Sequence, residues 1–268
     1  MNNIIITGVY GKMGEVLETL VNEKYKEKVE IILGYDIKDL KDKKYNVCTN
    51  AEELKKEIIS KYEKNISING LIDFSIPKCT IEILNVLKQL KEEKEIIIPI
   101  IIATTGFNQE EENQILEYSK SIPVFKSANM SFGIAVMKKA IQDIYQKYNF
   151  DIELEILEKH HRRKIDAPSG TAKLLADSLK EENKELKYVY DRESVRKPKE
   201  KNELGISSIR GGNIVGEHTV FFLDDDEILE ITHKAESRAI FANGAIKAMI
   251  YMQGKKDGIY SVEDMIKN

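Results

Sequence analysis

Six consecutive basic or imidazole residues run from Lys159 to Lys164, and they include His160 and His161, two of the four histidines in the chain. A histidine, with an ordinary pKa near ~6.5, or a lysine of lowered pKa can transfer a proton at neutral pH. Hydride reduction of a conjugated imine or enamine needs such a proton at the atom next to the one reduced. The run therefore indicates acid–base chemistry centred on His160, His161 and Lys164.

The residues that follow this basic run suit the binding of a small anion. Apolar residues recur at helical spacing over 172–179, which predicts an amphipathic helix. Ser169 can cap that helix, and the N–H groups of Gly170 and Thr171 in its first turn then form a seat for an anion. Cationic side chains beside a helix N-terminus favour a small molecule that carries carboxylates.

A solvated loop, a nucleic-acid contact and a zinc site are weaker interpretations of the basic run. A charged run is most often a solvated loop, but this one leaves the segment 151–156, whose alternating apolar and charged residues predict a half-buried strand. Nucleic-acid binding is disfavoured because the chain has a formal net charge of −4 and no aromatic residue in the run. A zinc site lacks a further ligand at a usual spacing. We therefore expect neither nucleic acid nor metal as a ligand.

A glycine-rich turn lies near the start of the chain. Gly8, Gly11 and Gly14 are spaced as GxxGxxG, which permits a sharp turn and a close approach of the backbone to a pyrophosphate. The spacing alone is a weak signal, and a strand–helix turn without a ligand is the alternative. Asp36 follows the next strand-like segment and is placed to accept hydrogen bonds from ribose hydroxyls. Residues 104–106 leave a further strand at the edge where open α/β sheets bind ligands, so the three features together predict dinucleotide binding.

The elements expected to position these residues fall into two parts. In the first part, strands are predicted at 4–6, 31–35, 70–74 and 96–103, and helices at 13–21 and 81–90. This alternation predicts βαβ units on a parallel sheet, the α/β class. After about residue 130, a helix near 137–144 precedes strands at 151–156, 206–209, 219–223 and 228–232. These strands predict an α+β domain on a mixed or antiparallel sheet, with a solvated Lys- and Glu-rich loop at 181–203 and a final helix at 242–252.

Composition narrows the class of protein further. Hydrophobic residues make up 42% of the 268 residues and charged residues 32%, which suits one large or two smaller cores beneath a hydrated surface. Cys48 and Cys79 have neither disulfide nor metal-ligand spacing. The chain opens without the features of a signal peptide, and its longest apolar run, 96–103, is too short to span a bilayer. We therefore expect a cytoplasmic protein with no membrane partner.

Four ordered motifs indicate a family that the chain resembles. A G-x-x-G-x-M-G motif is present at 8–14, and the long string E-x-H-H-x-x-K-x-D-A-P-S-G-T-A at 158–172. An R-x-G-x-x-x-G-x-H element is present at 210–218, and H-x-A-x-x-R-x-x-F-A-x-G-A at 233–245. Over nearly its whole length the chain resembles 4-hydroxy-tetrahydrodipicolinate reductase, formerly called dihydrodipicolinate reductase.

The resemblance implies an enzyme that reduces 4-hydroxy-tetrahydrodipicolinate to tetrahydrodipicolinate with NADH or NADPH and loss of water, in the diaminopimelate route to lysine. It implies a Rossmann-like dinucleotide-binding domain over 1–129, completed by about 240–268. It also implies a catalytic, substrate-binding and oligomerisation domain with a mixed sheet over 130–239, and a homotetramer.

The resemblance also implies roles for individual residues. Proton transfer falls on His160 and Lys164, with no division of the steps between them. Contacts with the substrate fall on His161, Ser169, Gly170, Thr171 and, at a greater distance, Arg238. Cofactor contacts fall on Gly8, Val9, Tyr10, Gly11, Lys12, Met13, Asp36, Ala103, Thr104, Thr105, Ser127, Ala128, Asn129 and Met130.

Two positions depart from the family pattern. Ala103 stands where the family commonly has glycine in a G-T-T-G-F turn, and its methyl group adds bulk on the nicotinamide side. Asp36 is followed by Ile37 and Lys38, whereas several members carry an arginine there for the 2′-phosphate of NADPH. The chain is therefore expected to use NADH at least as well as NADPH.

Other functions remain as alternatives. Another amino-acid-related nicotinamide dehydrogenase would share the glycine loop, but it has no need of the HHxxK and DAPSGT strings. A non-catalytic dinucleotide-binding sensor would need the glycine loop and Asp36, but not a histidine and a lysine beside an anion seat. A protein that binds its partners through a basic patch would explain the fewest of these motifs. The presence of both sites in one chain favours the reductase.

Overall fold

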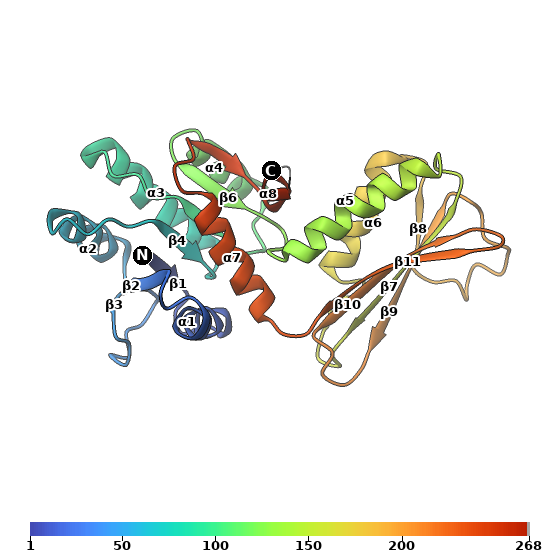
Figure 1. Cartoon of the computed structure of the whole chain (residues 1–268), viewed down its shortest axis with the longest axis horizontal. Coiled ribbons are helices and arrows are strands. Elements are labelled where there is room, and N and C mark those ends of the chain that lie inside the picture. The colour runs from blue at the N-terminus through green and yellow to red at the C-terminus, as the bar shows by residue number, and fades with distance from the viewer. Residues whose placement is uncertain (267–268) are drawn as a thin grey trace. The chain divides into compact units, whose positions relative to one another are not determined.

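The computed structural model describes residues 1–266, and the chain forms two compact units. The first unit comprises residues 1–130 together with the chain from Ala239 onward, and the second comprises Ser131–Arg238. Figure 1 shows the course of the chain, coloured by residue number. Each unit has its own sheet and its own buried core.

The first unit is built on a seven-stranded parallel sheet with strand order β12-β6-β5-β4-β1-β2-β3. Its strands are β1 (Asn2–Thr7), β2 (Val29–Tyr35), β3 (Asn46–Cys48), β4 (Gly70–Asp73), β5 (Ile100–Ile102), β6 (Pro123–Lys126) and β12 (Gly258–Tyr260). Its helices are α1 (Lys12–Lys24), α2 (Ala51–Glu63), α3 (Pro77–Lys94), α4 (Gln109–Ser119), α7 (Ala239–Tyr251) and α8 (Val262–Ile266). Successive isoleucines of β1 point to opposite faces of the sheet and are all buried, as expected for a parallel strand covered on both faces.

Helix α7 belongs to the core of the first unit although it lies far along the chain. It packs against α1 and contacts β4 and β5. Ala242, Ala245 and Met249 of this helix are fully buried. A side chain on Gly70 of β4 would collide with Met249, so the close approach of helix and sheet requires glycine at this position. The N-terminal and C-terminal parts of the chain therefore share one core.

The strand order of this sheet reverses between β1 and β4. In open parallel sheets, ligands bind at the carboxyl ends of the strands beside such a reversal. The segments that leave these ends are the glycine loop after Thr7, the residues after Asp73 and the turn that begins at Ala103. The sheet therefore brings two predicted cofactor-binding segments, the glycine loop and the turn at Ala103, to one edge, together with the residues after Asp73.

The second unit has a five-stranded mixed sheet with strand order β11-β10-β7-β9-β8. Strand β9 runs parallel to β7 and β8, whereas β10 runs antiparallel to β7 and β11. Its strands are β7 (Glu153–His160), β8 (Lys187–Val189), β9 (Glu203–Arg210), β10 (Gly216–Leu223) and β11 (Ile228–Ala235). Helices α5 (Phe132–Lys147) and α6 (Gly170–Glu182) lie side by side on one face of this sheet (Figure 1).

The predicted α/β fold, with one parallel sheet and a second, mixed sheet, is confirmed. Two local predictions were wrong. The segment 181–203 is not loop throughout, because Lys187–Val189 forms an edge strand whose Tyr188 packs on the core. The strand predicted at 96–103 is reduced to Ile100–Ile102, because the N–H of Ile96 closes helix α3 and Pro99 has no N–H to donate to a neighbouring strand.

Candidate active site

The register of the mixed sheet gathers polar side chains on the face that α5 and α6 cover. Along β7 two buried core residues are followed, on the same face, by Glu158 and His160, because side chains alternate along a strand. Strand β9 lies on one side of β7 and brings Ser208 and Arg210 beside these two residues. On the other side, β10 brings His218 beside Glu158. We refer to these five residues as the polar cluster.

Glu158 is the centre of the polar cluster and is fully buried. Its carboxylate accepts two hydrogen bonds from the Arg210 guanidinium, at 2.7 and 2.8 Å, one from Ser208 Oγ at 2.8 Å and one from the Ser169 N–H at 3.1 Å. Nδ1 of His160 lies 2.6 Å from the same carboxylate. Burial by itself raises the pKa of Glu158, but the hydrogen bonds, led by those from Arg210, outweigh it and lower the pKa to about 2. The carboxylate is therefore ionised at neutral pH.

His160 is held from several sides. One ring nitrogen faces Glu158, and the ring meets that of His218 edge to face with 5.2 Å between the ring centroids. On the remaining side, a Cβ added at Gly216 would lie 3.0 Å from Nε2 of His160. Glycine at this position of β10 thus leaves room for the imidazole, and the side chain of His160 is only 10% exposed.

Lys164 lies in the turn after β7, where its backbone N–H donates to the carbonyl of His161. Its Nζ is 2.8 Å from Oδ1 of Asp166, and this contact lowers the pKa of the Asp166 carboxyl. Arg210 donates to the backbone carbonyl of Asp166 at 2.7 Å. The loop that carries Lys164 is therefore tied to the same arginine that binds Glu158.

The predicted anion seat lies at the start of helix α6. Ser169 caps the helix by accepting a hydrogen bond from the N–H of Ala172 at 3.1 Å, and its hydroxyl also lies 2.9 Å from Nε2 of His218. Its side chain is consequently buried. Gly170 is exposed, with open space where a side chain would be, and Thr171 is half-buried. The accessible groups of this turn are therefore those of Gly170 and Thr171, with Ser169 holding the turn in place.

Arg238 adds positive charge to this unit and acts on His161. The pKa of His161 is lowered, first by desolvation and then by the charges of Arg163 and Arg238. Arg238 thus lies near enough to His161 for its charge to act on the imidazole. Nδ1 of His161 has no hydrogen-bond partner within the described part of the chain. These groups suit the binding of a ligand with negative charge.

The glycine loop of the first unit fits a phosphate group. Gly8 has φ +68°, and a Cβ on it would lie 2.5 Å from the carbonyl oxygen of Phe74. A Cβ on Gly14 would lie 2.3 Å from the carbonyl oxygen of Gly8. Both positions therefore require glycine, and the loop leads directly into the N-terminus of α1, where free N–H groups favour an anion.

Asp36 follows β2 and lies beside the glycine loop. Its carboxylate accepts hydrogen bonds from the N–H groups of Tyr10 at 3.0 Å and Ile37 at 2.8 Å. The side chain of Ile37 is 87% exposed. Nζ of Lys38 lies 5.7 Å from the centre of the Tyr10 ring. A carboxylate held in this way beside the loop fits the ribose hydroxyls of a dinucleotide.

Asp73 was not predicted as part of this region, yet it connects its segments. The carboxylate is fully buried at the end of β4 and accepts hydrogen bonds from four hydroxyl groups. These come from Thr7 at 2.5 Å, Ser75 at 2.5 Å, Thr80 at 2.5 Å and Thr104 at 2.9 Å. The predicted cofactor residue Thr104 is therefore buried against Asp73, and its hydroxyl also accepts a hydrogen bond from the N–H of Ser75.

The remaining predicted cofactor residues lie after β5 and β6, at the same edge of the sheet. Ala103 donates its N–H to the carbonyl of Asp73, and Thr105 is exposed. Ser127 Oγ donates to the carbonyl of Asn129 at 3.0 Å. Met130 is buried, and its carbonyl oxygen lies so close to Gly244 of α7 that any side chain at 244 would overlap it. The turn after β6 is thus held against α7.

Two family models together match almost the whole chain: dihydrodipicolinate reductase, N-terminus, over residues 2–130, and dihydrodipicolinate reductase, C-terminus, over residues 133–266. The chain belongs to the dihydrodipicolinate reductase family. Membership of this reductase family makes it an oxidoreductase that takes a nicotinamide dinucleotide.

Curated relatives of this family member are named 4-hydroxy-tetrahydrodipicolinate reductase. That of Clostridium novyi (strain NT) is 39% identical over 268 residues, covering 100% of this chain and 99% of the relative. That of Caldanaerobacter subterraneus subsp. tengcongensis is also 39% identical over 268 residues, with the same coverage. The structure of dipicolinate-bound dihydrodipicolinate reductase from Paenisporosarcina sp. TG-14 matches with a TM-score of 0.76 at 22% identity, covering 99% of each chain, and so has the same fold.

Four residues around His160 were not predicted as site residues of this family member. Arg210 and His218 are the first and last residues of one motif of the family, and Glu158 is the first residue of the longest motif. Their place in these motifs could have indicated a role in the site. Ser208 lies outside every motif, and only the pairing of β9 with β7 places it at the carboxylate.

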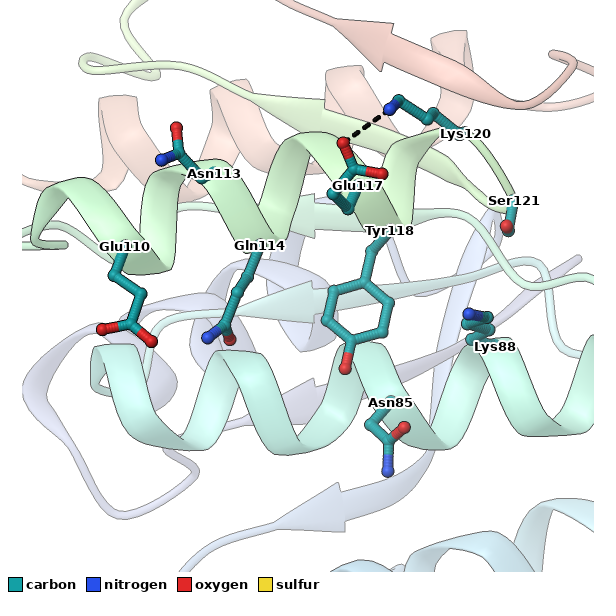
Figure 2. A pocket seen from close by; sticks show the side chains of 9 residues that line it. All are labelled: Asn85, Lys88, Glu110, Asn113, Gln114, Glu117, Tyr118, Lys120 and Ser121. Atoms are coloured by element: carbon teal, nitrogen blue, oxygen red, sulfur yellow. Dashed lines mark hydrogen bonds and ion pairs between the residues drawn. The ribbon is translucent and has the colours of Figure 1, made fainter.

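A polar groove of about 530 Å³ lies between α3 and α4 of the reductase (Figure 2). Lys120 and Glu117 form an ion pair at its rim, and it contains none of the residues predicted for the site. Its lining residues are Asn85, Lys88, Glu110, Asn113, Gln114, Glu117, Tyr118, Lys120 and Ser121.

Within residues 1–266, no group of three or more histidine, cysteine, aspartate or glutamate side chains is arranged to hold a metal ion. None of the described helices combines the length and the apolar character needed to cross a membrane.

Proposed function

We propose that this chain reduces 4-hydroxy-tetrahydrodipicolinate to tetrahydrodipicolinate with a nicotinamide dinucleotide, as the step of the diaminopimelate route to lysine that its relatives' name describes. The observation that carries the proposal is the arrangement around Glu158, in a member of this family. One buried carboxylate contacts His160 and the turn that begins α6, and its partner Arg210 contacts the loop of Lys164. The Glu158–Arg210 ion pair thus positions both the proton-transfer groups and the anion seat.

The proposed reaction consumes one hydride and one proton and releases one water. The hydroxyl group leaves one carbon and a proton leaves the neighbouring carbon, which releases water and gives a conjugated imine. The reduction then adds a hydride to the first of these carbons and a proton to the second. A bound nicotinamide supplies the hydride. We assign the proton transfers to His160 and Lys164, whose side chains are of the types that act as general acids and bases.

We assign substrate binding to the start of α6, His161 and Arg238. The N–H groups of Gly170 and Thr171 and the Thr171 hydroxyl bind a carboxylate, in a turn that Ser169 fixes. His161 binds a carboxylate as well, and Arg238 attracts the dianion from a greater distance. The dipicolinate-bound relative supports a planar ring with two carboxylates as the kind of ligand that fits this family.

We assign the dinucleotide to the first unit, with the pyrophosphate at residues 8–13, the adenosine ribose at Asp36 and the nicotinamide side at residues 103–105 and 127–130. We further propose that NADH serves at least as well as NADPH. The carboxylate of Asp36 attracts ribose hydroxyls but repels a 2′-phosphate, and no arginine follows it. Lys43 is ion-paired with Glu18 at 2.6 Å, so it offsets little of that repulsion.

We also propose that four copies of the chain assemble through the second unit. Both helices of residues 131–238 pack on one face of the mixed sheet. The other face carries Leu157, Ile209 and Phe221 at half-buried or exposed positions. Apolar side chains on an uncovered sheet face suit contact with another copy. Light scattering of the wild-type chain should give the mass of a tetramer, and Ile209→Glu should reduce it; a monomeric wild type would contradict the proposal.

The reaction is tested by following NADH and NADPH oxidation with enzymatically generated 4-hydroxy-tetrahydrodipicolinate. Turnover that depends on this substrate is expected with both cofactors. Aspartate and homoserine, each with the oxidised cofactor, should give no turnover, which separates the reductase from other amino-acid dehydrogenases. Binding of NADH without turnover of any of these compounds would instead support a non-catalytic sensor and overturn the proposal.

A further inference from the structure

We propose that Glu158 is a positioning residue of this reaction: its buried carboxylate holds His160 in the tautomer that carries hydrogen on Nδ1 and leaves the lone pair on Nε2. With Arg210 it also fixes the Lys164 loop and the start of α6 relative to that ring. This inference rests on the proposed function and adds to it the group that decides which nitrogen of His160 exchanges the proton.

The tautomer follows from what a carboxylate can do. An ionised carboxylate only accepts hydrogen bonds, so the 2.6 Å contact with His160 requires the hydrogen to lie on Nδ1. The low pKa of Glu158, about 2, keeps it ionised throughout the neutral range. The neutral imidazole then has its lone pair on Nε2, which lies beside Gly216, and glycine has no side chain to cover that atom from this side. Nε2 is therefore the atom that takes up and returns the proton.

Arg210 provides the charge balance that this arrangement needs. A buried carboxylate without a cation is strongly unfavourable, and the guanidinium supplies one through two hydrogen bonds of 2.7 and 2.8 Å. His160 consequently does not have to be the counter-ion of Glu158. The ring can alternate between its neutral and protonated forms while the carboxylate keeps its partner.

The same ion pair holds the rest of the site. Glu158 accepts the N–H of Ser169, which begins α6, at 3.1 Å, and Arg210 donates to the carbonyl of Asp166, two residues after Lys164, at 2.7 Å. Both connections are to the backbone, so they position whole segments rather than single side chains. A change at Glu158 therefore disturbs the proton-transfer ring directly and the two segments through their supports.

A double-mutant cycle tests whether Glu158 acts through His160. We expect Glu158→Gln to lower kcat by about 10²-fold, because an amide presents its N–H₂ group to the ring or to the guanidinium and favours the wrong tautomer. In a His160→Ala background, the same substitution should lower kcat by no more than about tenfold, because only its effect through the Lys164 loop and the start of α6 remains. An equal loss in both backgrounds would show that Glu158 has a general structural role and would overturn the proposal.

Glu203→Gln is the matched control. Glu203 is also a buried glutamate of the mixed sheet, and it accepts two hydrogen bonds of 3.1 Å from Arg192. Its substitution breaks a buried carboxylate–guanidinium pair that does not contact His160. We expect a lowered melting temperature in both glutamine variants but a kcat within about twofold of wild type only for Glu203→Gln. A comparable loss of kcat in the control would remove the special role of Glu158.

A measurement on the wild-type chain decides the tautomer even if Glu158→Gln does not fold. ¹⁵N spectra of the full chain labelled at histidine should show neutral His160 protonated on Nδ1, with the signal assigned by its loss in His160→Asn. Protonation on Nε2 would overturn the proposal. This measurement needs no turnover, so failure of the proposed reaction and failure of this inference are told apart.

Discussion

The hydroxyl of Ser169 lies 2.9 Å from Nε2 of His218, a buried imidazole that meets the ring of His160 edge to face. Since the same hydroxyl caps α6, His218 supports the turn to which we assign a substrate carboxylate. Burial, followed by the charge of His160, lowers the pKa of His218 from 6.5 to about 4. The support is therefore a neutral histidine under physiological conditions.

This pKa predicts how the folded state responds to acid. Because the pKa is lower in the folded than in the unfolded chain, the unfolded chain binds more protons between pH 6.5 and about 4. Stability is thus complete above pH 6.5 and falls as the pH drops toward 4, by at most about 3 kcal/mol from this residue. We expect His218→Gln, which keeps an N–H donor but does not titrate, to show a smaller loss of unfolding free energy over this range. Denaturant titrations at several pH values measure the unfolding free energy. If it falls as steeply with decreasing pH in His218→Gln as in the wild type, the lowered pKa of His218 is contradicted.

Removal of the Lys164 amine should impair the reaction but not cofactor binding. We expect Lys164→Ala to lower kcat by about 10²- to 10⁴-fold, the usual contribution of a positioned acid or base. NADH affinity, measured by fluorescence titration, should remain within about twofold, because the dinucleotide is assigned to the other unit. Lys184→Ala, an exposed lysine after α6, is the control and should leave both quantities unchanged. Loss of NADH binding in Lys164→Ala alone would mean that the site is misplaced.

The hydroxyl of Thr171 is expected to bind the substrate before and during the reaction. Thr171→Val keeps the size of the side chain and removes this hydrogen bond, so KM should rise by about tenfold while kcat changes little. Steady-state kinetics at saturating NADH separate the two parameters. An unchanged KM would exclude the Thr171 hydroxyl from the substrate site.

Cofactor choice should respond to a charge beside Asp36. Ile37→Arg places a guanidinium on an exposed position, and we expect kcat/KM for NADPH to rise by about tenfold, equivalent to about 1.4 kcal/mol, with less change for NADH. Ile37→Gln is the uncharged control. Added salt should narrow the difference between the cofactors in the wild type. A wild-type preference for NADPH of about tenfold or more would refute Asp36 as an unopposed ribose ligand.

A methyl group at position 216 should act on His160 from the side opposite Glu158. The Cβ of Gly216→Ala would lie 3.0 Å from Nε2, so the ring must shift by a few tenths of an ångström, and we expect kcat to fall by about tenfold. Gly211→Ala is a close control, because a Cβ there meets nothing within 4 Å. Equal activity of the two variants would show that Nε2 of His160 is not the reacting atom.

Features that depend on neighbours in sequence were predictable. The glycine loop was recognised because the contacts that exclude a side chain at Gly14 come from the carbonyls of Gly8 and Val9, only a few residues away. The cap of α6 was recognised for the same reason, since Ser169 and the N–H it binds are three residues apart. The spacing of apolar residues, which differs between helices and strands, then predicted the α/β class and the two sheets.

The polar cluster was not predictable, because strand pairing creates it. Ser208 and Arg210 are 50 and 52 residues from Glu158 in sequence, and only the register of β9 against β7 brings them to its carboxylate. A period of two indicates which face a residue lies on but not which residue lies beside it. Strands of three residues, such as β3, β8 and β12, are too short to show a period, and β8 was accordingly mistaken for loop.

Asp73 makes the segments around the cofactor region depend on one another. Its one buried carboxylate accepts hydrogen bonds from the hydroxyls of Thr7 at the end of β1, Ser75 after β4, Thr104 after β5 and Thr80 in the first turns of α3, and from the N–H of Ser75. Loss of any one hydroxyl leaves the carboxylate less satisfied, so the effect of a second substitution depends on the first. These positions are therefore epistatic. Replacing a single loop with that of a relative of another cofactor preference changes some of the hydroxyls that bind Asp73 and leaves the others. Exchanging Thr7, Ser75, Thr80 and Thr104 together keeps a matched set of donors.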